Sequence, residues 1–283
     1  MDDIERTAKF LAKEEEILER LRCGKNSEQL LDTKFPPVPW VIPGFVVPGL
    51  TILAGAPKIG KSWLAMGMAS ALATGGRVFG EIKVEMGDVL LLALEDTERR
   101  LKERLEKMWV RGSAHLNIRT EWPVGLECIR YLETWMDEYR ETKAVFIDTL
   151  QKVSGIIEQN NYRETYNAAA GLKKIADRYS VAIIVMHHTT KVVMQDFVHS
   201  VNGSVGLTGA ADTVITMQRL RMKNDGVLSV TGRDVEEKEY GIRFDPTIGT
   251  WTLLDEVPKE RPGWEPRTRH FRDGKKEAAG RDD

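Results

Sequence analysis

The sequence predicts an α/β protein with a mainly parallel sheet, flanking helices and a C-terminal antiparallel extension. Four nearly continuous apolar runs, of the kind that buried parallel strands need, alternate with segments of helical spacing. A glycine-rich turn joins the first run to its helix. After Asp212 the runs become shorter and partly alternating, and glycines separate them, as in antiparallel hairpins.

The N-terminal part is expected to differ from the sheet domain. Residues 2–23 have a charged helical pattern with apolar residues on one side, and Gly24 ends it. This helix could pack on its own domain or on a neighbouring subunit. Residues 35–48 contain five prolines, which favour an extended connector. We therefore expect a helix and linker over 1–34, a main domain over 35–255 and a charged, disordered tail over 256–283.

Within the main domain, apolar spacing and capping residues set the expected elements. Thr97 is a plausible N-cap for the second helix, and Gly75-Gly76 end the first. Strands are expected at 50–54, 89–94, 115–120, 144–149 and 181–186, and helices at 63–74, 97–109, 127–139 and 161–179. A hairpin is expected at 77–86, loops at 151–160 and 189–209, and the antiparallel extension at 214–217, 227–231, 240–244 and 250–254.

Composition and charge limit the class of protein. A length of 283 residues with 42% apolar and 30% charged residues is ordinary for a globular protein. No apolar run reaches membrane-spanning length and the acidic start is not a signal peptide, so a cytoplasmic protein is expected. A net charge of −2 argues against a basic surface that coats nucleic acid, but not against nucleic acid in a local pore. Cys23 and Cys128 provide neither a disulfide framework nor a metal cluster.

Residues 55–62 match a phosphate-binding motif of Gly, four residues, Gly, Lys and Ser. Its glycines let consecutive N–H groups face one concavity, to which the following helix adds its positive end. Lys61 would place its ammonium on the outer phosphates, and Ser62 would complete a Mg²⁺ shell. The strand before and the helix after make an incidental turn a weak alternative. The expected nucleotide-binding residues are Gly55, Ala56, Pro57, Lys58, Ile59, Gly60, Lys61, Ser62 and Trp63.

Polar side chains stand at the carboxyl ends of the buried strands, where α/β sheets bind ligands. Asp148 has the form of a carboxylate that orients Mg²⁺ or its water; the alternative is a solvated strand-end acid. Glu95 is placed to act as general base, whereas a helix-start role suits Asp96 better. His187 or His188 could contact the γ-phosphate, although one of such a pair often packs passively.

The segments GAPKIGKS, LLALED followed by ERRLKERL, VFIDT and VMHHTTK occur in this order. This set resembles the RecA-like P-loop ATPases, and within them the RepA type of hexameric replicative helicase of plasmids and mobile elements. The resemblance covers roughly residues 41–254. It implies a RecA-type core, ATP with Mg²⁺ at subunit interfaces, Glu95 as catalytic base, Asp148 as the Mg²⁺-side carboxylate, and His187, His188 and Lys191 in the γ-phosphate sensing segment.

The resemblance also implies residues that act beyond the nucleotide. The loops 151–160 and 189–206 would face a central channel and touch single-stranded DNA, with Lys152, Lys191 and His199 as contact candidates. The family carries an arginine finger in the segment corresponding to VNGSVGLTGAAD, where this chain has Asn202. The candidate substitutes, each of which could instead be a solvated strand-edge cation, are Arg219, Arg221, Lys223 and Arg233.

These residues predict an ATPase assembled as a ring, expected to be a hexamer, that moves along single-stranded DNA in the replication of a plasmid, phage or integrated element. One alternative is a RecA-like ATPase that does not unwind, such as a recombination mediator or remodelling switch. Another is an ATP-binding regulatory module whose ring is structural. The absent arginine favours this last alternative, whereas Lys61, Glu95 and Asp148 oppose it.

Overall fold

The structure is a computed structural model that describes residues 13–14, 17–18, 21, 24–155, 162–188, 205–219 and 223–258. Internal contacts divide the chain into two units, Met1–Val38 and Pro39–Asp283. The division lies close to the boundary expected after residue 34. Most of the tail expected at 256–283 lies outside the described residues.

The first unit contains exposed helical residues. The described positions between 13 and 21 are helical, as predicted, and the remaining positions of that helix lie outside the described residues. A short helix that the sequence pattern did not predict, α2 (Ser27–Leu31), follows. Asn26 and Gln29 cap it reciprocally, because each side chain accepts a hydrogen bond from the other residue's backbone N–H. None of the residues of α2 is buried.

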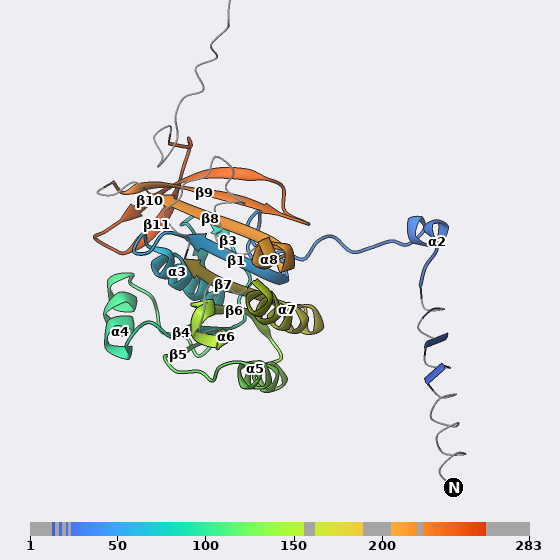
Figure 1. The fold of residues 1–283 in the computed structure, drawn as a ribbon. Helices are drawn as coiled ribbons and strands as arrows, with labels where there is room; N and C mark the ends of the chain where they lie inside the picture. The colour runs from blue at the N-terminus through green and yellow to red at the C-terminus, as the bar shows by residue number, and fades with distance from the viewer. Residues whose placement is uncertain are drawn as a thin grey trace, which may run out of the picture. The chain divides into compact units, whose positions relative to one another are not determined.

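The second unit is built on a sheet that has nine strands among the described residues (Figure 1). The strand order is β11-β10-β9-β8-β1-β7-β6-β4-β5. Neighbours pair in parallel from β8 to β5 and antiparallel from β8 to β11. The strands are β1 (Gly49–Gly55), β4 (Asp88–Ala93), β5 (Leu116–Arg119), β6 (Thr142–Asp148), β7 (Ala182–His188), β8 (Thr213–Arg219), β9 (Asp225–Gly232), β10 (Lys238–Asp245) and β11 (Thr250–Leu254).

Helices connect the parallel strands and cover the sheet, which confirms the predicted fold class. They are α3 (Lys61–Thr74), α4 (Glu98–Lys107), α5 (Leu126–Glu138), α6 (Leu150–Ser154), α7 (Tyr162–Tyr179) and α8 (Val205–Ala210). The predicted hairpin is β2 (Arg77–Val78) with β3 (Ile82–Lys83). Thr97 caps α4 as expected, because its side chain accepts from the Arg100 N–H. Within the described residues, none of the helices combines the length and apolar character needed to cross a membrane.

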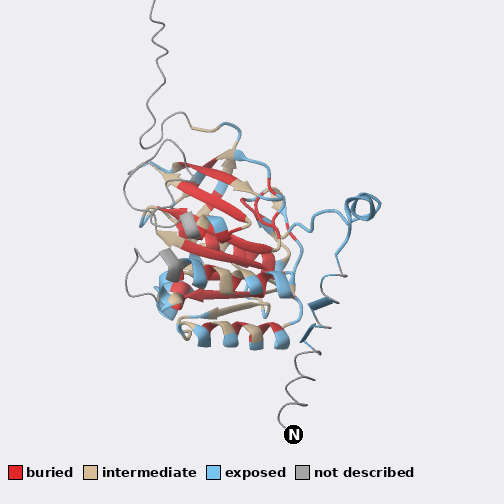
Figure 2. Cartoon of the chain, turned by 45° about the vertical axis from the view of Figure 1, so that its right-hand side comes forward, coloured by how far each residue is buried: buried red, intermediate tan, exposed pale blue. Residues whose placement is uncertain are grey.

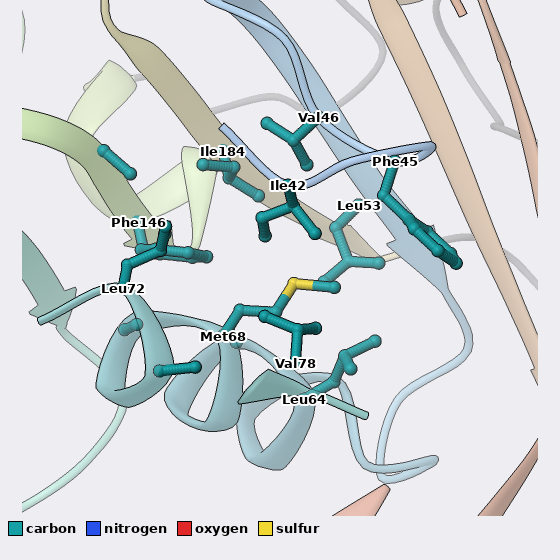
Figure 3. Close-up of a cluster of buried hydrophobic side chains, with 14 of the residues drawn as sticks. Ile42, Phe45, Val46, Leu53, Leu64, Met68, Leu72, Val78, Phe146 and Ile184 are labelled. Atoms are coloured by element: carbon teal, nitrogen blue, oxygen red, sulfur yellow. The ribbon is translucent and has the colours of Figure 1, made fainter. Parts of the chain in front are cut away.

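The central strands are buried on both faces, because each face packs into a hydrophobic cluster of its own (Figure 2). Successive residues of a strand point to opposite faces, so they contribute to the two clusters in turn. On one face, Phe146 and Ile184 meet Leu64, Met68 and Leu72 of α3 (Figure 3). On the other face, Val145 and Ile147 of β6 and Ile183 and Val185 of β7 pack with α5 and α7. A fully buried side chain of this size contributes about 2 kcal/mol. These two cores hold the strand ends, and therefore the candidate site, in fixed positions.

Three details differ from the expected elements. Residues 151–160 were expected to be a loop, but α6 occupies their start, because Leu150 and Val153 are buried one turn apart. The end of the 189–209 segment is also helical, as α8, while 189–204 lies outside the described residues. The run 214–217 belongs to β8, which pairs in parallel with β1 and antiparallel with β9. The antiparallel extension therefore begins one strand later than expected.

Candidate active site

The phosphate loop connects the end of β1 to α3, and neighbouring segments restrict both of its glycines. A Cβ atom on Gly55 would lie 2.7 Å from the backbone oxygen of Met217 in β8. Gly60 has a φ of 106°, and a Cβ there would lie 2.7 Å from the Trp251 ring. Lys58 also has a positive φ, of 64°. The glycines are thus needed for packing against β8 and β11 as well as for the turn itself.

Lys61 is the first residue of α3, and its side chain folds back under the loop. The residue is 5% exposed. Its Nζ donates hydrogen bonds to the backbone oxygens of Gly55 (2.7 Å) and Ala56 (2.9 Å), and lies 3.2 Å from Nδ1 of His188. Burial lowers the pKa of the ammonium from 10.5 to about 8, although Asp148 and Glu95 act in the opposite direction. A buried cation of this kind is suited to an anionic ligand.

Ser62 and Asp148 form the second contact of the site. The Ser62 hydroxyl donates to Asp148 Oδ2 at 2.6 Å, which joins the start of α3 to the end of β6. Burial raises the pKa of the Asp148 carboxyl, whereas the Ser62 hydrogen bond lowers it. Both atoms are hard oxygen donors on one side of the phosphate loop. This donor set fits Mg²⁺, and a bound dication would favour the ionised carboxylate.

Glu95 follows β4 and is held by the end of the neighbouring strand. Its Oε1 accepts a hydrogen bond from Thr149 Oγ1 at 3.1 Å, and its Oε2 lies 3.7 Å from His188 Nε2. Thr149 is buried, while the Glu95 side chain is 41% exposed. The sequence motifs did not predict a role for Thr149. The one feature that could have indicated it is its position directly after Asp148, the last residue of β6, which pairs in parallel with β4.

The two histidines at the end of β7 differ in their position. His188 stands between Lys61 and Glu95, and its two ring nitrogens face one residue each. His187 precedes it on the same strand, where successive side chains point to opposite faces. His188 is therefore the histidine that the structure brings into the cluster with the phosphate loop.

Asp96 has a structural role, as its place before the helix suggested. Its carboxylate lies 2.7 Å from Arg100 Nε and 2.5 Å from Arg104 Nη1, both on α4. The Arg104 guanidinium also lies over the Trp63 ring, 5.1 Å from its centroid. These contacts fix the position of α4 relative to the first turn of α3.

Aromatic residues of the antiparallel extension lie against the phosphate loop, and no local pattern predicted this contact. Trp251 Nε1 donates to the Gly60 backbone oxygen at 3.3 Å. Its ring lies 5.0 Å from that of Phe244, which in turn lies 6.0 Å from that of Trp63. The Arg219 guanidinium lies over both Phe244 and Trp251. The extension thus contacts the nucleotide-binding loop directly.

The remaining candidates lie away from this cluster or outside the described residues. Lys152 is exposed on α6. Arg219 uses its guanidinium for the backbone oxygen of Lys223 and for the aromatic rings. Arg233 lies 3.4 Å from Asp212, at the end of β8 opposite to the phosphate loop. Positions outside the described residues are Lys191, His199, Asn202 and Arg221.

Asp212 anchors the opposite end of the central strands. No sequence motif predicted this role. Asp212 Oδ2 accepts from the Leu50 N–H at 2.8 Å and lies 3.1 Å from Lys173 Nζ. Gly49 has a φ of 127°, and a Cβ there would lie 2.4 Å from the same oxygen. The aspartate therefore holds the start of β1, whose other end carries the phosphate loop.

Comparisons with known proteins agree with this arrangement. The AAA domain family matches residues 17–194. The DNA repair protein RadA of Listeria monocytogenes serovar 1/2a is 26% identical over 172 residues, which are 60% of this chain and 34% of RadA, so the chain spans about a third of that relative. A solved DnaB-like replicative helicase, described with its interactions with primase, has a TM-score of 0.61 and 16% identity, over 90% of this chain and 74% of that chain.

At 16% identity, the likeness to the helicase structure concerns the fold alone. The fold confirms the resemblance to RecA-like P-loop ATPases, whereas the RepA type remains a prediction. The family match covers more than half of the chain and includes the phosphate loop, Glu95, Asp148 and His188. The chain belongs to the AAA domain family and has the fold of a RecA-like P-loop ATPase.

Proposed function

We propose that the protein is an ATP-hydrolysing RecA-like ring motor, a replicative DNA helicase of a plasmid, phage or integrated element. It uses ATP with Mg²⁺, acts in the cytoplasm as a homo-oligomer, a hexamer, and moves along single-stranded DNA. The observation that carries the ATPase part is one contact cluster at the carboxyl ends of β1, β4, β6 and β7. Lys61 lies 3.2 Å from His188, which lies 3.7 Å from Glu95, and the adjacent Ser62 donates to Asp148 at 2.6 Å.

In this proposal the phosphate loop binds the triphosphate. The Lys61 ammonium exchanges its two backbone carbonyl partners for phosphate oxygens, which relieves the burial of an ammonium without an anionic partner at short range. Ser62 and Asp148 would hold Mg²⁺, and the bound ion would supply positive charge beside the phosphates. The start of α3 adds its N–H groups to the same place.

Glu95 acts as the general base for the attacking water. The hydrogen bond from Thr149 fixes Oε1, so that Oε2 faces the His188 side of the site. Hydrolysis of a phosphoryl group needs mainly a positioned nucleophile and compensated charge, and this pair supplies the position. His188 contacts both the residue that binds phosphate and the residue that activates water. It is therefore the residue proposed to sense the γ-phosphate.

The DNA part of the proposal rests on the relatives. One is named a DNA repair protein and another is described as a replicative helicase. Lys152, Lys191 and His199 would contact DNA from the channel loops, and the N-terminal helix would serve assembly. Arg219, Arg221, Lys223 and Arg233 remain the candidates for a cation that acts on a neighbouring subunit.

The likeness to RadA favours a second candidate function, a RecA-like ATPase in recombination or repair that does not unwind DNA. Both functions use the same hydrolytic cluster. They differ in whether ATP hydrolysis that is stimulated by single-stranded DNA also opens a forked duplex. A forked duplex that is opened in the presence of ATP supports the helicase, whereas DNA-stimulated turnover without opening supports the second function.

ATP turnover tests the hydrolytic cluster. Lys61→Ala and Glu95→Gln are each expected to lower kcat by about 10²–10⁴-fold, because the first removes charge from the phosphates and the second removes the base. Glu98→Gln is the matched control, since Glu98 is an exposed acid on α4 close to Glu95 in sequence. Turnover that is equal in the wild type and in both site variants would refute the ATPase proposal.

A further inference from the structure

A cavity of about 610 Å³ lies beside α3, on the side away from the Lys61 contacts. This volume is in the range of sites for small molecules. Its walls come from α3, from the β2–β3 hairpin, from the segment after α4 and from β11. All of these segments are among the described residues. Most wall residues are apolar, and they include Trp63, Met68, Val78, Met108, Trp109 and Trp251.

One polar group in the wall has no partner. Ser70 of α3 is 6% exposed, and its hydroxyl makes no hydrogen bond within the described part of the chain. A buried hydroxyl without a partner costs about 1–3 kcal/mol. Alanine at this position would avoid the cost, and α3 already contains alanine at several buried positions. The hydroxyl oxygen itself has almost no accessible surface, so Ser70 contributes to the cavity as a small wall residue.

The floor of the cavity is open because of a glycine. Gly67 lies inside α3, where glycine costs about 1 kcal/mol relative to alanine. A Cβ atom there would be 3.5 Å from the Met108 methyl group, which is ordinary contact. Packing therefore does not demand glycine, and the missing side chain leaves space in the cavity.

Two arginines give the rim a positive charge. Arg77 and Arg111 line the cavity and are exposed, and within the described residues neither forms an ion pair with a carboxylate. Arg77 donates through Nη1 to the Glu81 backbone oxygen, which leaves other guanidinium donors. An apolar interior with tryptophan walls and a cationic rim suits an aromatic acid.

We propose that this cavity is a second ligand site, for a small aromatic molecule with a carboxylate or sulfonate group. The aromatic part lies between the tryptophans, and the acid group meets the rim arginines. Occupancy reaches the phosphate loop, because Trp251 donates to the Gly60 oxygen and Trp63 directly follows Ser62. The binding step itself needs no ATP hydrolysis.

The test uses 8-anilinonaphthalene-1-sulfonate, an aromatic sulfonate whose fluorescence rises in apolar sites. The full chain is expected to bind it saturably, with one high-affinity site per chain and a Kd of about 1–100 µM. Ser70→Leu fills the cavity and is expected to weaken binding at least tenfold. The double variant Arg77→Gln/Arg111→Gln, at exposed positions that do not threaten folding, is expected to weaken it severalfold and to reduce its salt dependence.

Arg130→Gln is the matched control, since Arg130 is an exposed arginine on α5, which packs on the other face of the sheet. It is expected to bind the probe like the wild type. Equal binding in the wild type, Ser70→Leu and the double arginine variant would overturn the proposal. So would loss of the site when the protein assembles, because a neighbouring copy would then fill the cavity. If Ser70→Leu fails to fold, probe binding by the Arg77→Gln/Arg111→Gln variant decides the test: binding equal to that of the wild type overturns the proposal.

Coupling to the phosphate loop has its own readout. The affinity for a non-hydrolysable ATP analogue is expected to change at least threefold when the probe saturates the cavity. Affinity that stays constant would overturn the coupling. Because probe binding is measured without nucleotide, failure of the second site and failure of the ATPase proposal give different results.

Discussion

Burial of Lys61 makes the free energy of unfolding depend on pH. The pKa of Lys61 is lowered to about 8 because burial penalises the ammonium more than Asp148 and Glu95 favour it. The unfolded chain holds this proton up to its ordinary pKa of 10.5. Between about pH 8 and 10.5 the unfolded state therefore binds more protons than the folded state. Over this window Lys61 makes the free energy of unfolding rise with pH, and below it the ammonium opposes folding.

Nucleotide affinity should depend on pH in the opposite direction. Below about pH 8 Lys61 is already charged, whereas above it binding to phosphate must take up a proton. Affinity for an ATP analogue is expected to fall about tenfold per pH unit above pH 8. Phosphate groups titrate near pH 6, so the fall belongs to the protein. Equilibrium dialysis between pH 7 and 10 measures it, and an affinity that stays flat to pH 10 would contradict the lowered pKa.

At the scale of elements, the β10–β11 hairpin acts as a support for the phosphate loop. The hairpin turn contains Gly249, whose φ is 66° and whose Cβ would lie 2.3 Å from the Trp63 ring. Trp251 contacts Gly60 and donates to its backbone oxygen. The extension thus packs against both ends of the segment that enters α3. From this arrangement we expect a change in β11 to alter the phosphate loop.

Replacing Trp251 by Phe tests this support. The ring contact with Phe244 is largely retained, whereas the hydrogen bond to Gly60 is lost. KM for ATP is expected to rise about three- to tenfold with little change in kcat, because one hydrogen bond contributes about 0.5–1.5 kcal/mol. Trp135→Phe is the control, since Trp135 is a buried tryptophan on the other face of the sheet. The idea is wrong if both variants lower thermal stability and neither changes KM.

At the scale of the whole molecule, the candidate site is expected to be completed by a second copy of the chain. The cluster holds the groups proposed to bind phosphate and to activate water, whereas the described contacts of Arg219 and Arg233 lie within their own subunit. The mass of the assembly, measured by light scattering, is expected to increase to that of a hexamer with ATP and single-stranded DNA. Lys61→Ala should remain smaller under the same conditions. A wild type that stays monomeric with both ligands would contradict the ring.

Part of this protein could be predicted from local patterns. The apolar runs identified the parallel strands, since strands buried on both faces need them, and their carboxyl ends meet at one edge of the sheet. The phosphate loop followed from its glycine, lysine and serine motif, and Glu95, Asp148 and the histidine pair followed from their place at the strand ends. The short helix α6 did not, because five residues are too few to show a helical period. Its hydrophobic positions acquire meaning only when the sheet buries them.

The sequence by itself determined the class of fold and the chemical groups of the candidate site. Both can be recognised from short stretches of residues that are neighbours along the chain. Only the tertiary structure decided which groups meet. It placed Thr149 against Glu95, His188 between Lys61 and Glu95, and Trp251 on Gly60. It also made β8 parallel to β1. Each of these contacts joins segments far apart in the chain, and their pairing follows from strand order and packing, which no local pattern contains.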